Sequence, residues 1–233
     1  MDKKYVGWLA LIVALVISGA QMLSRFTSAV AAWSQDSTCT VIIDAGHGGE
    51  DGGAVSVTGV YESKINLEIS LRLNDFLHLL GIRTAMIRDS DISVYTEGDT
   101  VAQRKVSDIK NRVNTVENTP NAVLVSIHQN HFSEEKYHGA QVFFAQTDGS
   151  EDLAKSLQDS LIAQVDPENH RVTKKAQDIY LMKHVSCPAV LIECGFLSNY
   201  EEEQRLQDSE YQKKLTAVIG CCIYNYLEAR NEV

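Results

Sequence analysis

The sequence has few of the features that mark fibrous, disulfide-rich and nucleic-acid-binding proteins. Three Pro and 14 Gly among 233 residues are too few for a collagen-like or Pro-rich chain. The five Cys include no CxxC pair, which argues against a disulfide framework in a domain of this size. Lys and Arg number 21 against 31 Asp and Glu, so the chain lacks the cationic excess that a general nucleic-acid binder needs. We therefore expect no nucleic-acid partner.

The charges are unevenly distributed along the chain. Residues 5–24 contain no Asp, Glu, Lys or Arg, and a helix of that length can span the hydrocarbon core of a bilayer. Lys3 and Lys4 precede this run, so the positive-inside rule places the N-terminus in the cytoplasm. A second interpretation is a signal peptide, because residues 29–31 (Ala-Val-Ala) fit a cleavage site. Both interpretations place the rest of the chain at the outer face of the cytoplasmic membrane, anchored or secreted.

These observations divide the chain into four segments. We expect a cytoplasmic stub over residues 1–4, a transmembrane anchor or signal segment over 5–24, a linker over 25–39 and one domain over 40–233. The formal charge is +1 over residues 1–39 and -11 over the remaining residues. With 44% hydrophobic and 22% charged residues overall, the chain can bury a core. We expect the Cys residues to act as small buried hydrophobes.

The domain alternates short apolar runs with segments of helical periodicity. Strands are predicted over residues 40–44, 83–87, 122–127, 140–144, 179–182 and 189–192, and helices over 63–80, 101–118, 151–165 and 209–229. Such alternation is typical of an α/β fold. We predict a three-layer sandwich in which helices flank a central, mostly parallel mixed sheet.

Polar residues with metal-binding chemistry follow several of the predicted strands. His47 lies in a Gly-rich loop after the first strand, and His128 follows the central strand. Glu193 ends a late strand, and Glu62 begins the first long helix. Sites in open α/β sheets gather beyond the carboxyl ends of the strands. Two His and one Glu are a ligand set of catalytic zinc, and a further carboxylate can take a proton from water.

The residues alone leave other interpretations open. Glu62 could be an ordinary acid at a helix start, where it favours the macrodipole. His131 competes with His128 as a ligand, since it lies three residues further on. The Gly-rich loop could cradle a phosphate, although it lacks the GK[ST] of a P-loop and the spacing of GxGxxG. The separations of 15, 66 and 65 residues between the four side chains are not a local metal motif.

Four segments of the domain resemble a known family. They are similar to the zinc-dependent N-acetylmuramoyl-L-alanine amidases of the amidase-3 type. The four segments are VIIDAGHGGEDGGA (41–54), YESKINLEISLRL (61–73), LVSIHQNH (124–131) and AVLIECGFLSN (189–199). The resemblance covers about residues 40–230, so it implies a catalytic amidase domain over 40–233. It implies that His47, Glu62 and His128 bind Zn²⁺ and that Glu193 is catalytic. The substrate it implies is the amide between muramic acid and L-alanine in peptidoglycan.

A narrower resemblance concerns the spore-cortex enzymes of this family. An N-terminal anchor, a bare catalytic domain and the QNH of SIHQNH are similar to that subgroup. The subgroup implies a role in sporulation, in forming muramic δ-lactam of the cortex that germination requires. The family's helix motif has two candidate arginines here, Arg104 and Arg112.

The substrate contacts and partners rest on weaker signals. A local basic cluster could bind carboxylates of the stem peptide. It consists of Arg171, Lys174, Lys175 and Lys183. The predicted substrate-binding residues are Gln129, Asn130, Arg171 and Lys174. Two alternative functions are a zinc peptidase that cuts stem-peptide bonds and a non-catalytic wall-binding module. The sequence does not itself reveal an accessory protein partner, but a partner that completes the site is one expectation.

Overall fold

The computed structural model describes residues 39–232. The chain divides into two units, residues 1–36 and 37–233. The predicted stub, the predicted anchor or signal segment and all but the last residue of the predicted linker lie outside the described residues. Within residues 39–232, no helix has both the length and the apolar character that a membrane crossing requires.

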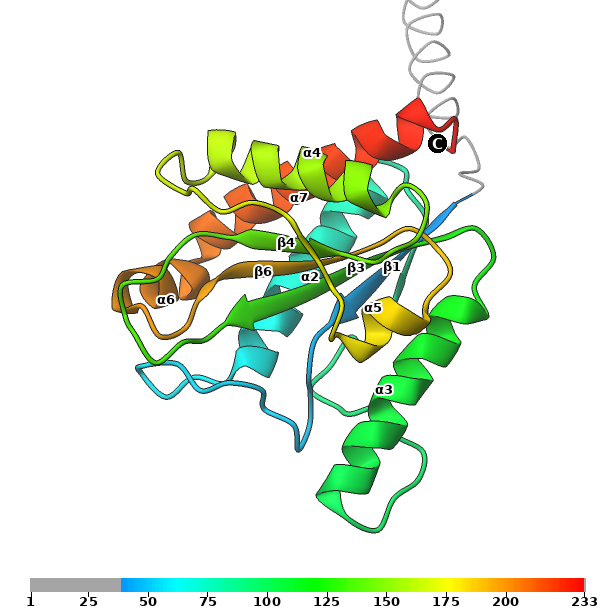
Figure 1. The fold of residues 1–233 in the computed structure, drawn as a ribbon, viewed down its shortest axis with the longest axis horizontal. Coiled ribbons are helices and arrows are strands. Elements are labelled where there is room, and N and C mark those ends of the chain that lie inside the picture. The colour runs from blue at the N-terminus through cyan, green and yellow to red at the C-terminus, as the bar shows by residue number, and fades with distance from the viewer. Residues whose placement is uncertain (1–38, 233) are drawn as a thin grey trace, which may run out of the picture. The chain divides into compact units, whose positions relative to one another are not determined.

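A six-stranded mixed sheet forms the centre of the domain (Figure 1). Its strands are β1 (Thr40–Ala45), β2 (Thr84–Met86), β3 (Ala122–Asn130), β4 (Gln141–Phe144), β5 (Lys174–Lys175) and β6 (Ala189–Phe196). They lie in the order β2-β1-β3-β6-β4-β5. The first four strands of this order are mutually parallel, whereas β4 runs antiparallel to β6 and β5 runs parallel to β4.

Helices cover both faces of the sheet and create two apolar cores. The helices are α2 (Glu62–Leu79), α3 (Val101–Glu117), α4 (Ser150–Gln164), α5 (Tyr180–His184), α6 (Tyr200–Gln207) and α7 (Ser209–Ala229). The larger core joins alternate residues of β1, β3 and β6 to α2, α4 and α7. The smaller core lies on the other face of the sheet, against α3 and α5. The α/β three-layer sandwich predicted from the sequence is therefore confirmed.

One predicted strand is wrong. Residues 179–182 were expected to form a strand, but α5 is a short helix that begins at Tyr180. Leu181 and Met182 are both buried in the same core, and adjacent residues of a strand, which point to opposite faces, could not both reach it. The adjoining edge strand is the two-residue β5, which the sequence did not predict. Helix α6 was also not predicted.

Two central strands are longer than their apolar runs. Strand β3 continues through His128 to Asn130, and β6 continues through Glu193 to Phe196. Although the side chains at these strand ends are polar, the main-chain pairing continues: Leu124–His128 stay in register with Ala189–Glu193. The polar residues expected to follow these strands are therefore held inside the sheet.

The cysteines match the expectation in part. Within residues 39–232, no disulfide links the five Cys. Cys39, Cys194 and Cys222 are buried, whereas Cys187 is half-buried and Cys221 is exposed. Burial raises the pKa of the Cys187 thiol to about 11, so it stays protonated at neutral pH.

Candidate metal centre

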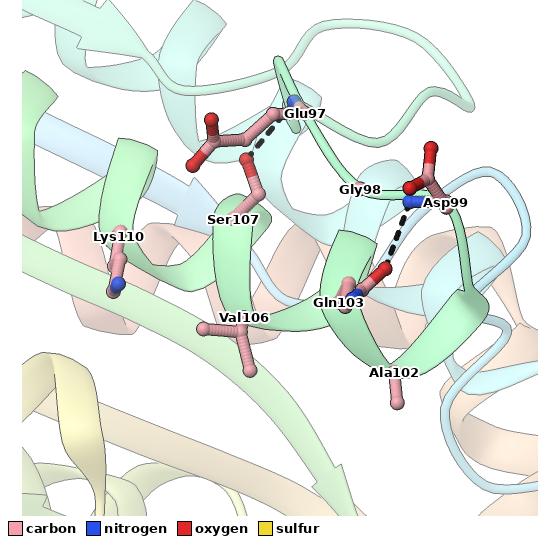
Figure 2. Close-up of a pocket in the computed structure, with 8 residues that line it drawn as sticks. All are labelled: Glu97, Gly98, Asp99, Ala102, Gln103, Val106, Ser107 and Lys110. Atoms are coloured by element: carbon pink, nitrogen blue, oxygen red, sulfur yellow. Dashed lines mark hydrogen bonds between the residues drawn. The ribbon is translucent and has the colours of Figure 1, made fainter.

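Helix α3 borders two hollows of different character. The larger, of about 660 Å³, lies at its N-terminal half and is lined by residues from Glu97 to Lys110 (Figure 2). None of the site residues predicted from the sequence lines it. The smaller hollow, of about 290 Å³, lies between α3, the ends of β1, β3 and β6, and α5, and His47, His128 and Glu193 all line it. The chemistry of the lining therefore identifies the smaller hollow as the candidate site.

The loop after β1 brings His47 close to β3. Gly46 donates its N–H to the carbonyl of Ile127 at 3.0 Å, which keeps the loop against the end of β3. A Cβ at Gly46 would lie 2.2 Å from the imidazole of His128, so only glycine fits there. His47 itself adopts φ 60, a left-handed conformation that most side chains avoid.

Three of the predicted ligands converge. One potential ligand atom each from His47, Glu62 and His128 lies within 4.8 Å of the others. Nε2 of His47 is 3.2 Å from Oε2 of Glu62, and Nδ1 of His128 is 2.9 Å from Oε1 of the same carboxylate. The two imidazoles meet edge to face with centroids 5.0 Å apart. His131 is exposed and does not belong to this group.

Glu62 is the buried centre of this group. It begins α2, and its side chain is only 5% exposed. Five nitrogens surround its carboxylate: Nε2 of His47, Nδ1 of His128, Nδ2 of Asn66 and the main-chain N–H groups of Ala54 and Gln129. Burial alone would raise its pKa, but the contacts with His128 and His47 outweigh burial and hold the pKa well below its usual range. Glu62 is therefore an anion ready to bind a cation.

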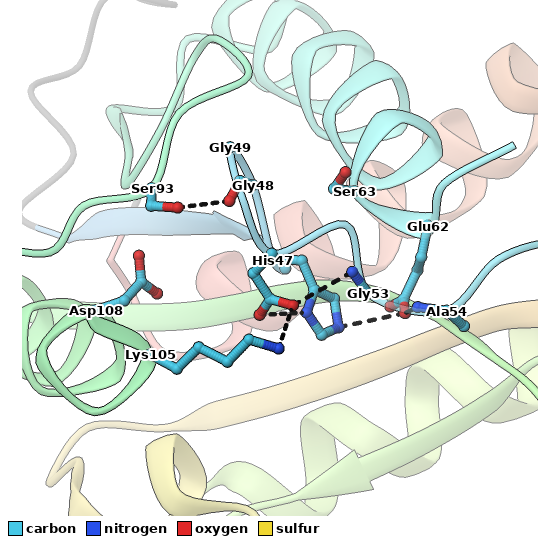
Figure 3. A network of polar contacts seen from close by, with 12 residues as sticks. His47, Gly48, Gly49, Gly53, Ala54, Glu62, Ser63, Ser93, Lys105 and Asp108 are labelled. Atoms are coloured by element: carbon cyan, nitrogen blue, oxygen red, sulfur yellow. Dashed lines mark hydrogen bonds and ion pairs between the residues drawn. The ribbon is translucent and has the colours of Figure 1, made fainter. Parts of the chain in front are cut away.

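Asp51 is a further member of the centre that the sequence analysis missed. Its Oδ2 lies 2.9 Å from Nδ1 of His47, and Lys105 of α3 pairs with its Oδ1 at 2.8 Å. Figure 3 shows the ring of His47 between the side chains of Lys105 and Glu62. A carboxylate that holds one ring nitrogen of a histidine fixes the tautomer in which the other nitrogen binds metal. Burial lowers the pKa of His47, but Asp51 and Glu62 outweigh it and raise that pKa to about 9. The only sequence signal was its position four residues after His47.

Glu193 stands beside the three converging side chains. It is the register partner of His128 on the neighbouring strand, and residues that are directly paired point to the same face. Its Oε2 is buried and has no hydrogen-bond partner among the described residues. Burial raises the pKa of Glu193 to about 7; Glu62 adds to this rise, while the two histidines partly offset it. A carboxyl with that pKa can both accept and return a proton near neutral pH.

Two buried arginines fix the loop that carries His47. Arg112 of α3 pairs with Asp44 and donates to the carbonyl of His47 at 2.8 Å. Arg88 donates to the carbonyls of Ala45, Gly46 and Ser63 at 2.8–2.9 Å, so it ties the loop to the start of α2. The structure therefore distinguishes the two arginines of the α3 motif, because Arg104 pairs with Glu50 at the surface.

The predicted substrate residues occupy different environments. Gln129 is buried on the α2 side of the sheet, where its amide donates to Asn66. Asn130 is half-buried at the end of β3. Arg171 is half-buried beside β4, and Lys174 is exposed on β5. Their roles in binding substrate stay predictions.

The residues of the centre fit a zinc ion. Two imidazoles and one carboxylate are ligands that catalytic zinc sites use, and such sites leave a fourth position for water or substrate. The uncommitted oxygen of Glu193 lies next to that group, where a water or substrate atom could satisfy it. His47 also has the outer carboxylate partner that zinc-binding histidines usually have.

Comparisons with known proteins agree with this centre. Residues 41–225 match the family model described as N-acetylmuramoyl-L-alanine amidase. A germination-specific N-acetylmuramoyl-L-alanine amidase of Bacillus subtilis is 32% identical over 99% of this chain and 98% of its own length.

Solved structures of amidases share the fold. The CwlD amidase of Clostridioides difficile, solved in complex with the GerS lipoprotein, is 40% identical with a TM-score of 0.78, over 82% of this chain and 98% of its own. An N-acetylmuramoyl-L-alanine amidase of Clostridium difficile 630 is 30% identical with a TM-score of 0.72, over 83% of this chain and 99% of its own. The family match includes His47, Asp51, Glu62, His128 and Glu193.

Proposed function

The chain belongs to the amidase-3 family of N-acetylmuramoyl-L-alanine amidases, and on that premise we propose that it is a zinc enzyme of the spore cortex. As a member of this family it hydrolyses the amide that joins N-acetylmuramic acid to the L-alanine of the peptidoglycan stem. Zinc is the proposed cofactor because of the donor set, and the cortex is the proposed substrate because of the germination-specific relative.

His47, Glu62 and His128 would hold the ion, with Asp51 orienting His47. Bound zinc would lower the pKa of a water and polarise the carbonyl of the scissile amide. Glu193 accepts the proton of the attacking water and returns it to the amine of the leaving L-alanine. Arg112 and Arg88 keep the His47 loop in place through main-chain carbonyls.

One observation carries this proposal: a buried oxygen of Glu193, which has no hydrogen-bond partner within residues 39–232, lies one strand away from a His–Glu–His group. A structural carboxylate in that position would be expected to have a hydrogen-bond donor. The test is reconstitution of the metal-stripped chain with Zn²⁺, Mg²⁺ or Ca²⁺. Activity should return with zinc, and its return with Mg²⁺ or Ca²⁺ alone would overturn the proposed cofactor.

The cortex role is tested in a spore-forming bacterium that lacks its own germination-specific amidase. Expression of this chain should restore muramic δ-lactam in the cortex, whereas the Glu193→Gln variant should not. Peptidoglycan cleavage in vitro without δ-lactam in spores would leave the amidase activity intact and overturn the cortex role.

We also propose that the domain works at the outer face of the cytoplasmic membrane with a lipoprotein partner. The apolar run of residues 5–24 supports this location, and the lipoprotein complex of the CwlD relative supports the partner. Protease added to intact protoplasts should digest the domain. Co-purification of a membrane lipoprotein with the tagged full-length chain would support the partner, and purification from sporulating cells without one would count against it.

A further inference from the structure

Three side chains form a row across the sheet at the candidate centre. His128 of β3 is in register with Glu193 of β6, which in turn is in register with Gln141 of β4. Paired residues of neighbouring strands point to the same face, with their Cβ atoms about 5 Å apart. The row therefore extends from the metal-binding group, past the catalytic carboxylate, towards the β4 edge of the sheet.

Arg171 stands at the end of this row in a fixed position. Its Nε donates to the carbonyl of His138 at 2.7 Å, and its Nη1 lies 3.4 Å from Oε1 of Gln141. The guanidinium carbon is 4.3 Å from the ring centroid of the buried Phe196, which is close enough for a cation–π contact. These contacts place a cation at the end of the row, separated from His128 by the side chains of Glu193 and Gln141.

This cation forms no ion pair within residues 39–232: no carboxylate oxygen lies within 4.0 Å of a nitrogen of Arg171. The acidic group that acts on it, at longer range, is the buried Glu202, whose carboxylate accepts from the main-chain N–H groups of Gly139 and Phe196. The Nη2 of Arg171 makes no hydrogen bond within residues 39–232. Arg112, in contrast, uses its donors on Asp44, Asp108 and main-chain carbonyls. The guanidinium of Arg171 is therefore fixed in position, and its Nη2 is available to donate hydrogen bonds to a ligand.

The surroundings of Arg171 are apolar on one side. Phe132 is 49% exposed, and its ring lies 5.8 Å from that of Phe196 and 5.1 Å from that of Tyr137. An anion bound against such rings competes with less water, so its pairing with a guanidinium is stronger than at an open surface. Lys174, in contrast, is exposed on β5. The structure thus separates Arg171 from the other members of the basic cluster.

We propose that Arg171 binds a carboxylate of the stem peptide and so makes the enzyme prefer acidic stems over amidated ones. The scissile amide lies at the first residue of the stem peptide, L-alanine. The carboxylates of the stem lie one or more residues further along. A guanidinium forms two parallel hydrogen bonds with a carboxylate, whereas a carboxamide is neutral and offers one acceptor oxygen. The inference rests on the proposed hydrolysis at the neighbouring centre.

The test compares two disaccharide–tetrapeptide muropeptides that differ only in the α-carboxyl group of D-glutamate, which is free in one and amidated in the other. Full-length wild-type enzyme should cleave the free acid with a kcat/KM about 10- to 100-fold higher. Arg171→Met, which keeps the aliphatic stem over Phe196, should abolish this preference, mainly through a higher KM for the free acid. Arg171→Lys keeps the charge but not the two-pronged geometry, so it should retain part of the preference.

Arg230→Met is the matched control, because Arg230 also stacks on an aromatic ring, that of Tyr226, but lies beside the hollow at the opposite ends of the strands. It should keep the wild-type preference. Equal cleavage of both substrates by the wild type, or an equal loss on both in Arg171→Met, would overturn the inference while leaving the amidase mechanism intact. Failure of the wild type to cleave either substrate would overturn the proposed function instead.

Discussion

His128 on β3 and Glu193 on β6 are register partners, although 65 residues separate them in the sequence. Their pairing places a candidate metal ligand and a candidate proton acceptor side by side on the same face of the sheet. The parallel pairing of these two central strands therefore fixes the relation between the metal and the base.

The histidines of the centre should be required for metal binding. His47→Ala or His128→Ala removes one of three ligands, so we expect the purified variants to contain less than about a tenth of the wild-type zinc. Metal content per chain can be measured by atomic emission after gel filtration. The control is His131→Ala, which should retain full zinc because His131 lies outside the converging group. Zinc loss in His131→Ala with zinc retained in His128→Ala would reverse the assignment.

Asp51 should tune the metal affinity without binding the ion. Asp51→Asn weakens the contact that orients His47, and losses of such outer partners typically cost about 10- to 100-fold in affinity. Competition with a chromogenic chelator gives the Kd for zinc. Asp89→Asn is the control, since Asp89 is exposed and accepts a hydrogen bond from the neighbouring Ser90. An unchanged Kd in Asp51→Asn would show that His47 needs no carboxylate partner.

Glu193 should lower the stability of the zinc-free protein at neutral pH. Its pKa is raised from 4.5 to about 7, so the folded state keeps a proton that the unfolded state releases between these values. Wild-type stability should therefore fall as the pH rises from 4.5 to 7 and change little above 7 on this account. Glu193→Gln does not titrate, and above pH 7 it should be more stable than the wild type by about 1–2 kcal/mol, allowing for partial exposure.

Urea denaturation at pH 5 and pH 8, with a chelator present, measures this difference. The stability difference between Glu193→Gln and the wild type should reach its full value above pH 7, and it should be small near pH 5. If Glu193→Gln were more stable than the wild type by the same amount at both pH values, ionisation of the Glu193 carboxylate would not be what destabilises the wild type.

The buried pair of Arg112 and Asp44 should be essential for folding stability. Arg112→Met leaves Asp44 as an unpaired buried carboxylate, which typically costs about 3–5 kcal/mol. Burial raises the pKa of Asp44, but Arg112, together with His128 and Ser126, outweighs burial and lowers that pKa below its usual range. The pair therefore contributes above a pH of about 4 and less as the pH falls through the lower folded-state pKa.

The deficit of Arg112→Met should accordingly be larger at pH 7 than at pH 4 in urea denaturation, because Asp44 can take up a proton in the variant. Asp44→Asn combined with Arg112→Met should recover part of the loss. Arg104→Met is the control, because its pair with Glu50 lies at the surface, where solvent screens the charges, so its loss should change the free energy of unfolding little. Equal losses in the two arginine variants would contradict the assignment.

The sequence predicts the layers of the fold and the four central side chains, for different reasons. Apolar periodicity identifies the buried strands and helices, because burial imposes it directly. His47, Glu62, His128 and Glu193 lie at strand ends and a helix start, where a parallel sheet gathers its functional groups. Family resemblance then gives each residue its predicted role.

Features that depend on tertiary contact were not predictable in this way. Asp51 reaches His47 only because Gly48 and Asp51 exchange main-chain hydrogen bonds, which folds the loop back on itself. Arg88 looks like a surface residue beyond a strand, yet its donors are used on carbonyls of the His47 loop and of α2. The apolar run at residues 179–182 is compatible with strand and helix alike, and packing against the smaller core decides for the helix.

The most direct test of the account is mass spectrometry of sacculi digested by the full-length, zinc-loaded enzyme and by its Glu193→Gln variant. The wild type should release intact stem peptides that begin with L-alanine and leave N-acetylmuramic acid with a free lactyl carboxyl group. Glu193→Gln should bind the same amount of zinc and form these products at least about 100-fold more slowly. Products cut within the stem peptide, or near-normal release by Glu193→Gln with zinc bound, would contradict the account.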